Sequence, residues 1–122
     1  MRLIRTPFGA ALWIALLMGG CGNARTAPSI GDAEHGKLLL RQYGCGACHR
    51  IPGVAVAHGN VGPSLERIAE RVYLAGMLPN VPENMVRWIR APRAIDPLTG
   101  MPDLRVPEPH ARDMTAYLYT LR

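Results

Sequence analysis

Apolar side chains recur at spacings of three and four residues in several stretches of the chain, which is typical of amphipathic helices. Asp32 and Ser64 are good N-caps for two of these stretches, and Pro82 suits the first position of a third. No stretch of useful length alternates between apolar and polar residues, so we expect an all-α domain. The expected helices span about 32–43, 64–72, 82–91 and 107–122.

The N-terminal segment has the features of a secretion signal. Arg2 and Arg5 precede an uncharged apolar stretch over 8–20, which is too short to span a bilayer comfortably. The stretch ends at Cys21 after two glycines and resembles a bacterial lipoprotein signal, in which this cysteine is lipidated. Alternatives are cleavage near Ala24 or an uncut short anchor. We expect a lipoprotein-type signal peptide over 1–20, a flexible tether over 21–30 and one folded domain over 31–122.

The composition limits what this domain can be. With 122 residues, 11 Pro, 13 Gly and only 6% aromatic residues, the chain predicts a single loop-rich domain that would gain from an added apolar body such as a cofactor. Without residues 1–20 the formal net charge falls from +5 to +3. Since the basic residues form no run, we expect no nucleic-acid partner.

The chemistry is concentrated at Cys45-Gly46-Ala47-Cys48-His49. A zinc site would lack a good fourth ligand, a redox dithiol would lack its βαβ context, and a disulfide would close a very small loop. After a secretion signal, C-x-x-C-H indicates one covalent haem c per chain. Cys45 and Cys48 would form thioethers with the haem vinyl groups, and His49 would be an axial ligand of the iron.

A second axial ligand would have to come from elsewhere in the chain. Met85 and Met114 are expected to pack in the core, His35 and His110 to be solvated, and Met77 and His58 to lie in loops. Met101 lies between Pro97 and Pro102, in a stiff extended loop that can hold a thioether against the iron. We therefore expect Met101 to be the distal ligand.

Taken in order, these motifs resemble class I cytochrome c over nearly all of 31–122. The shared residues are Gly31-Asp32, the C-x-x-C-H motif, Gly62-Pro63-Ser64-Leu65, Pro97-x-Thr99-x-Met101-Pro102 and Ala116-Tyr117-Leu118. The stretches 71–76, 82–84 and 87–89 are similar to the cytochrome domains fused to subunit two of some bacterial haem-copper oxidases. The resemblance implies a small fold of four to five helices wrapped around a covalent haem.

The resemblance also implies roles for further residues. The Pro63 carbonyl would accept a hydrogen bond from His49, and Gly36 would let the first helix cross the last against Tyr117 and Leu118. Trp88 would lie near the bound methionine, with plain core filling as the alternative. Arg71 and Tyr73 would bind a haem propionate, although Arg71 could equally be a surface charge. Arg105 stands where the family commonly has glycine.

With both axial positions filled, the expected function is one-electron transfer in a bacterial respiratory chain, without a small-molecule substrate and without enzyme activity of its own. Expected partners are a terminal oxidase or a quinol-oxidising complex, on the periplasmic side of a membrane that holds the lipid anchor. One alternative is an electron-entry subunit bound permanently to a periplasmic dehydrogenase or oxidase. Another is a five-coordinate haem enzyme or gas sensor, if Met101 does not bind.

Several arginines surround the expected haem site and can steer acidic partners towards it. The alternative is a solvated face in a composition that favours arginine over lysine. The residues concerned are Arg87, Arg90, Arg93 and Arg105 around the Met101 loop, and Arg41 and Arg50 beside the cysteine motif.

Overall fold

The structure is a computed structural model that describes residues 29–122. The expected signal peptide over 1–20, the lipidation site Cys21 and most of the tether lie outside the described residues. The domain is mostly helical, and the expectation of an all-α fold is corrected by a small two-stranded sheet. The elements are α1 (Ala33–Gln42), η1 (Cys45–Ala47), η2 (Ile68–Glu70), β1 (Tyr73–Leu74), β2 (Leu78–Pro79), α2 (Pro82–Arg90), α3 (Pro92–Ile95) and α4 (Glu108–Leu118).

Three of the four expected helices are present, and local signals explain where they begin. The Asp32 carboxylate caps α1 by accepting the His35 backbone N–H at 3.0 Å. At the start of α2, Pro82 occupies a first-turn position whose N–H has no partner within a helix. Pro109 is tolerated in the first turn of α4 for the same reason.

The prediction of a helix over 64–72 is wrong, because only the single 3-10 turn η2 forms there. Arg67 adopts a left-handed φ of 53°, which interrupts any helix that begins at Ser64. The segment is held instead by tertiary hydrogen bonds. The Asn80 side-chain amide donates to the carbonyls of Ile68 and Arg71 at 2.8 and 2.7 Å. Val72, expected on the buried face, is 74% exposed.

The sheet is a hairpin of two-residue antiparallel strands that the sequence did not predict. Tyr73 pairs with Pro79 and Leu74 pairs with Leu78. Ala75 and Gly76, with φ values of 49° and 74°, form the turn in the left-handed conformation that tight hairpins require. Strands this short carry no alternation that a sequence pattern can reveal.

Helices α1 and α4 cross in close contact at Gly36. A Cβ atom at this position would lie 1.9 Å from the Asp113 carbonyl oxygen and 2.8 Å from the Met114 nitrogen. The expected close crossing is present, but its partners are the Asp113 and Met114 backbones, one turn before Tyr117 and Leu118. The Asp113 carboxylate strengthens the crossing by accepting hydrogen bonds from the Asp32 N–H and the His35 ring, each at 2.8 Å.

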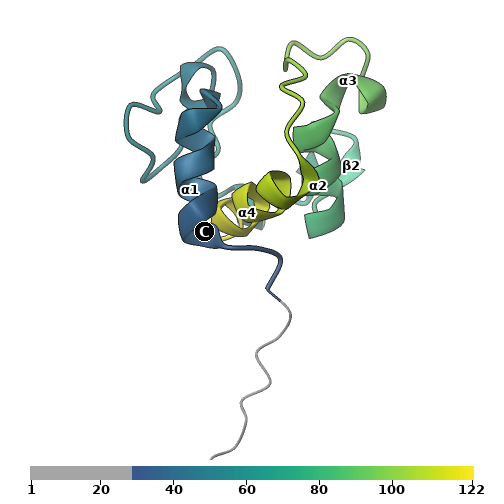
Figure 1. The fold of residues 1–122 in the computed structure, drawn as a ribbon. Helices are drawn as coiled ribbons and strands as arrows, with labels where there is room; N and C mark the ends of the chain where they lie inside the picture. The colour runs from purple at the N-terminus through teal and green to yellow at the C-terminus, as the bar shows by residue number, and fades with distance from the viewer. Residues whose placement is uncertain (1–28) are drawn as a thin grey trace, which may run out of the picture.

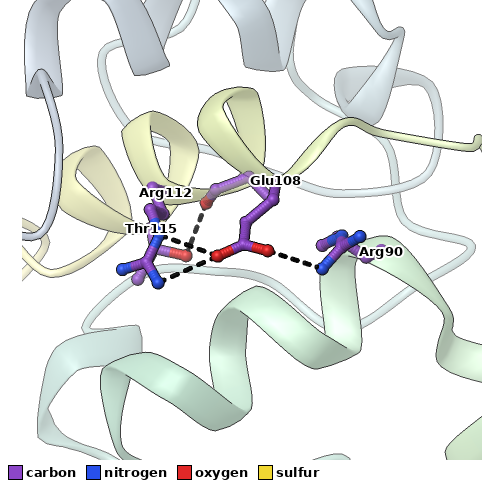
Figure 2. Close-up of polar contacts among 5 residues, drawn as sticks. Arg90, Glu108, Arg112 and Thr115 are labelled. Carbon is purple, nitrogen blue, oxygen red and sulfur yellow. Dashed lines mark hydrogen bonds and ion pairs between the residues drawn. The ribbon is translucent and has the colours of Figure 1, made fainter.

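Helix α4 also joins α1 to the other half of the domain. Figure 1 shows α1 on one side, α2 and α3 on the other, and α4 running between them at the base. At the α2–α4 contact, Figure 2 shows Glu108 between Arg90 and Arg112, with ion pairs of 3.1 and 2.9 Å. Within residues 29–122, no helix combines the length and apolar character needed to cross a bilayer.

Candidate functional site

A cavity of about 600 Å³ is lined by residues of α1, α2 and α4 and of the segments between them, so both halves of the domain contribute to its walls. One wall contains the cysteine motif that follows α1, and another contains the loop that follows α3. Most of the remaining surface is apolar, so a bound group would be shielded from water. The apolar residues from the α-helices are Leu40, Met85, Trp88, Ile89, Met114 and Leu118, those from η2 and β1 are Ile68 and Leu74, and those from the loops are Val61, Leu65, Leu104 and Val106.

The cysteine motif forms a tight turn that presents its side chains to the cavity. Gly44 enters the turn with a left-handed φ of 71°, and the Cys45 carbonyl accepts the N–H groups of Cys48 and His49 at 3.2 and 2.9 Å. Both thiols are free and half-buried. Burial raises the pKa of Cys45, which is opposite to the lowered pKa that activates the thiol of a redox dithiol.

The His49 ring is held in one orientation and one tautomer. Its Nδ1 lies 2.7 Å from the Pro63 carbonyl oxygen, which can only accept a hydrogen bond. Nδ1 therefore carries the proton, and in the neutral ring Nε2 has a free lone pair for a metal ion. Gly62 packs against the same ring, where a Cβ atom would lie 2.5 Å from Cε1. Any larger residue at position 62 would therefore collide with the His49 ring in this orientation.

The loop that carries Met101 is stiffened by hydrogen bonds from side chains to nearby backbone groups. Asp96 accepts the Leu98 N–H at 3.0 Å, and Thr99 Oγ1 accepts the Met101 N–H at 3.2 Å. Beyond Met101, Asp103 accepts the Arg105 N–H at 2.9 Å. Met101 itself is half-buried and lines the cavity. The loop is therefore ordered by its own side chains, although it has no regular secondary structure.

The residues expected near a haem edge have different locations. Trp88 and Arg71 line the cavity, and the Arg71 guanidinium donates a hydrogen bond to the Ser64 carbonyl. Tyr73 is 57% exposed on β1 and is not part of the cavity wall. The structure thus brings Trp88 and Arg71 together with the cysteine motif, His49 and Met101, and leaves Tyr73 outside.

The other methionines and histidines considered as axial ligands lie in different parts of the structure. Met85 and Met114 are buried in the cavity wall, whereas Met77 is 47% exposed and lies elsewhere. His110 was expected in solvent, but it is half-buried, and its Nδ1 lies 2.9 Å from the Tyr43 hydroxyl. This contact forms because Tyr43, at the end of α1, packs beside the first turn of α4.

Asn80 is a structural residue of the site that the sequence analysis missed. Besides its two amide bonds to the 68–71 segment, its Oδ1 accepts the Tyr119 hydroxyl at 2.7 Å. It therefore connects a cavity wall to the end of the chain. A single asparagine in a loop has no periodicity or motif, so the sequence contained no signal for this role. Gly62 and Thr99 were noted only as parts of shared motifs.

These features fit a haem c group. The cavity is large and mostly apolar, as a buried macrocycle requires, and its lining includes two thiols, one imidazole and the thioethers of Met85, Met101 and Met114. Arg71 adds a cation in the wall that can face a propionate. Residues 29–122 contain no group of three or more His, Cys, Asp or Glu side chains placed to hold a metal ion directly.

Comparison with known proteins relates the chain to an oxidase subunit. No family model matches the sequence. Cytochrome c oxidase subunit 2 of Alkalihalophilus pseudofirmus is 32% identical over 90 residues, which are 74% of this chain. The chain spans 25% of the length of that relative, so the relationship is distant and partial. It agrees with the resemblance to subunit two noted in the sequence.

The match also corrects one expectation. The sequence predicted an electron carrier that is not itself an enzyme, with a place as a subunit of an oxidoreductase complex as the alternative. The relative is by name a subunit of an oxidase, and an oxidase is an oxidoreductase enzyme. The similarity therefore contradicts the expectation that the chain is not an enzyme.

Proposed function

We propose that this chain is a haem c electron-transfer unit that works with a respiratory oxidase complex, and that residues 31–122 form a class I cytochrome c domain. The observation that carries the proposal is a single apolar cavity lined by Cys45, Cys48, His49 and Met101. The partial relationship to an oxidase subunit supports the respiratory context. Haem c, when bound, supplies one-electron transfer between ferric and ferrous iron.

In this proposal each residue at the site has a distinct task. Cys45 and Cys48 attach the cofactor covalently through thioether bonds. His49 offers Nε2 as the proximal ligand, because Pro63 holds the proton on Nδ1. Met101 offers its sulfur from a loop whose backbone is already ordered. If His49 and Met101 were both to hold the iron of a bound haem, no position would be left for a small molecule, and the site would be restricted to electron transfer.

The cavity walls tune the site through solvation. Met85, Met114 and Leu118 are buried side chains that keep water from the cofactor space. An added positive charge is poorly solvated in such surroundings, so the walls favour the reduced state. A thioether ligand favours ferrous iron as well. Both effects raise the reduction potential, in keeping with a donor to an oxidase.

The proposal extends to the segment before the domain. We propose that residues 1–20 are a lipoprotein-type signal peptide, that Cys21 is lipidated, and that 21–30 tether the domain at the periplasmic side of a membrane. The apolar stretch over 8–20 and the small residues before Cys21 support this. Mass spectrometry of the mature protein reports the cleavage site and the lipid mass together.

The decisive experiment compares Met101→Ala with Met77→Ala in protein from a host that attaches haem c. Met77 is a matched control because it lies outside the cavity wall. We expect one covalent haem in all samples and slow carbon monoxide binding by the reduced wild type and Met77→Ala. Met101→Ala should bind carbon monoxide rapidly, because its distal position is open.

Two outcomes would refute the proposal at different points. A mature protein with two unmodified thiols at Cys45 and Cys48 would exclude covalent haem c. Rapid carbon monoxide binding by both wild type and Met101→Ala would favour the five-coordinate alternative, and slow binding by both would assign the distal position to a side chain other than Met101.

A further inference from the structure

A second concavity, of about 570 Å³, lies on the opposite face of α2 from the cavity lined by Cys45, His49 and Met101, which we call the haem cavity after the cofactor proposed for it. Its residues come from α2, α3 and the loop that leads into α4. We call it the arginine groove, after three arginines that stand around an apolar base. Its main residues are Arg87, Arg90, Arg105, Asp103, Ile95 and Val106.

The groove has more positive than negative charge. Three arginines line it, and Asp103 is the only acidic residue in its lining within the described chain. The Asp103 Oδ1 already accepts the Arg105 backbone N–H at 2.9 Å. Arg90 is partly neutralised by Glu108, but that carboxylate is shared with Arg112 (Figure 2). An anionic partner would therefore relieve repulsion between the arginines.

Arg105 occupies an unusual backbone position for its residue type. Its φ of 53° lies in the left-handed region, where glycine has no steric penalty and other residues are disfavoured. The hydrogen bond from its N–H to Asp103 supports this conformation. Position 105 therefore has a long charged side chain where glycine would have less backbone strain, and Arg105 lines the groove. Such local strain is a reason to look for function.

The groove also adjoins the haem cavity. Buried Val106 lines both spaces and separates them. Helix α2 also contributes to both spaces. Trp88 and Ile89 on one face line the haem cavity, and Arg87 and Arg90 on the other face line the groove. A molecule bound in the groove at Val106 would therefore contact a residue that also forms the wall of the haem cavity.

We propose that the arginine groove is the docking site for an acidic surface of the electron-transfer partner protein; this inference rests on the proposed function. Guanidinium groups pair with carboxylates through two parallel hydrogen bonds, which fixes orientation as well as affinity. The position beside the haem cavity favours a redox protein as the occupant, because docking there shortens the path for an electron. A membrane surface would gain nothing from that proximity.

The test uses a pair of charge-matched double variants. Arg87→Gln with Arg105→Gly removes two positive charges from the groove and spares Arg90, whose ion pair joins α2 to α4. Arg122→Gln with Arg67→Gly removes two positive charges at exposed residues that line neither the groove nor the haem cavity. Arg67 is a close control for Arg105, because it is exposed and has the same φ of 53°.

The first measurement follows oxidation of the reduced holoprotein by oxidase-containing membranes of the source bacterium. At low ionic strength we expect the groove variant to react about tenfold more slowly than wild type and to lose most of its salt dependence. The control should stay within about twofold of wild type. Equal losses in the two variants, or no loss in either, would overturn the docking site.

The second measurement needs no redox activity, so it separates failure of the groove from failure of the proposed function. Amide NMR of the reduced holoprotein follows titration with hexaglutamate. We expect shifts at 87–95 and 103–107 that the groove variant loses and the control keeps. Shifts elsewhere, or equal binding by the groove variant, would overturn the site. Tighter binding there of inorganic phosphate or of phosphatidylglycerol vesicles would overturn a protein as the partner.

Discussion

The contact at Gly36 gives the most quantitative prediction about this fold. In Gly36→Ala, the new Cβ would lie 1.9 Å from the Asp113 carbonyl oxygen, whereas ordinary contact begins at 3.4 Å. The shortfall is about 1.5 Å and involves backbone atoms on both helices. No side-chain rotation can relieve it, so α1 and α4 must move apart.

Two opposing effects decide the magnitude. Overpacking in a close contact costs up to about 3 kcal/mol, and a backbone collision belongs at the upper end of that range. Alanine gains about 1 kcal/mol over glycine in helix propensity. We therefore expect a net destabilisation of about 2 kcal/mol, which corresponds to a fall in Tm of about 10 °C for a domain of this size.

Thermal and denaturant unfolding followed by circular dichroism will measure this loss in the holoprotein. Gln42→Ala is the control, because Gln42 is an exposed residue of the same helix and lies outside the cavity wall. Its free energy of unfolding should change by less than about 0.5 kcal/mol. If Gly36→Ala is equally neutral, the α1–α4 crossing described above is incorrect.

Three further variants test other contacts. The hydrogen bond from the Asp32 N–H, followed by that from His35, holds the pKa of Asp113 below its usual value of 3.8. Because the folded pKa is the lower one, the advantage of wild type over Asp113→Asn in unfolding free energy should be present at pH 7 and shrink as the pH falls below 3.8. Val56 is 76% exposed with a φ of 57°, so Val56→Gly should raise the unfolding free energy by about 0.5–1 kcal/mol; a decrease would contradict the strain argument. Asn80→Ala removes three hydrogen bonds and should cost about 2 kcal/mol in denaturant unfolding, and a loss below 0.5 kcal/mol would show that water replaces them.

The electron-transfer proposal and the docking proposal are linked through α2. This helix supplies Trp88 and Ile89 to the haem cavity and Arg87 and Arg90 to the arginine groove. Its residue Arg90 also forms an ion pair with Glu108 on α4. A variant that loosens this contact, such as Glu108→Gln, is therefore unsuitable as a test of either surface alone, which is why Arg90 is left intact in the docking experiment.

The elements that sequence reasoning found are those with local causes. The cap at Asp32, the proline at the start of α2 and the apolar stripe of α4 act within a few residues, so a pattern can reveal them. The C-x-x-C-H motif and the proline-bounded Met101 loop are equally local. For this reason the candidate site residues were identified before their arrangement was known.

The features that required the tertiary structure depend on distant partners. The segment over 64–72 has helical periodicity, but the Asn80 bonds and the left-handed Arg67 hold it in another form. The partner of Gly36, the exposure of Tyr73 and the adjacency of the arginine groove to the haem cavity likewise follow from how α1, α2 and α4 pack. The intrinsic helix propensity of a residue contributes about tenths of a kcal/mol to stability. A set of tertiary contacts contributes several times more, so these contacts decide the structure where the two disagree.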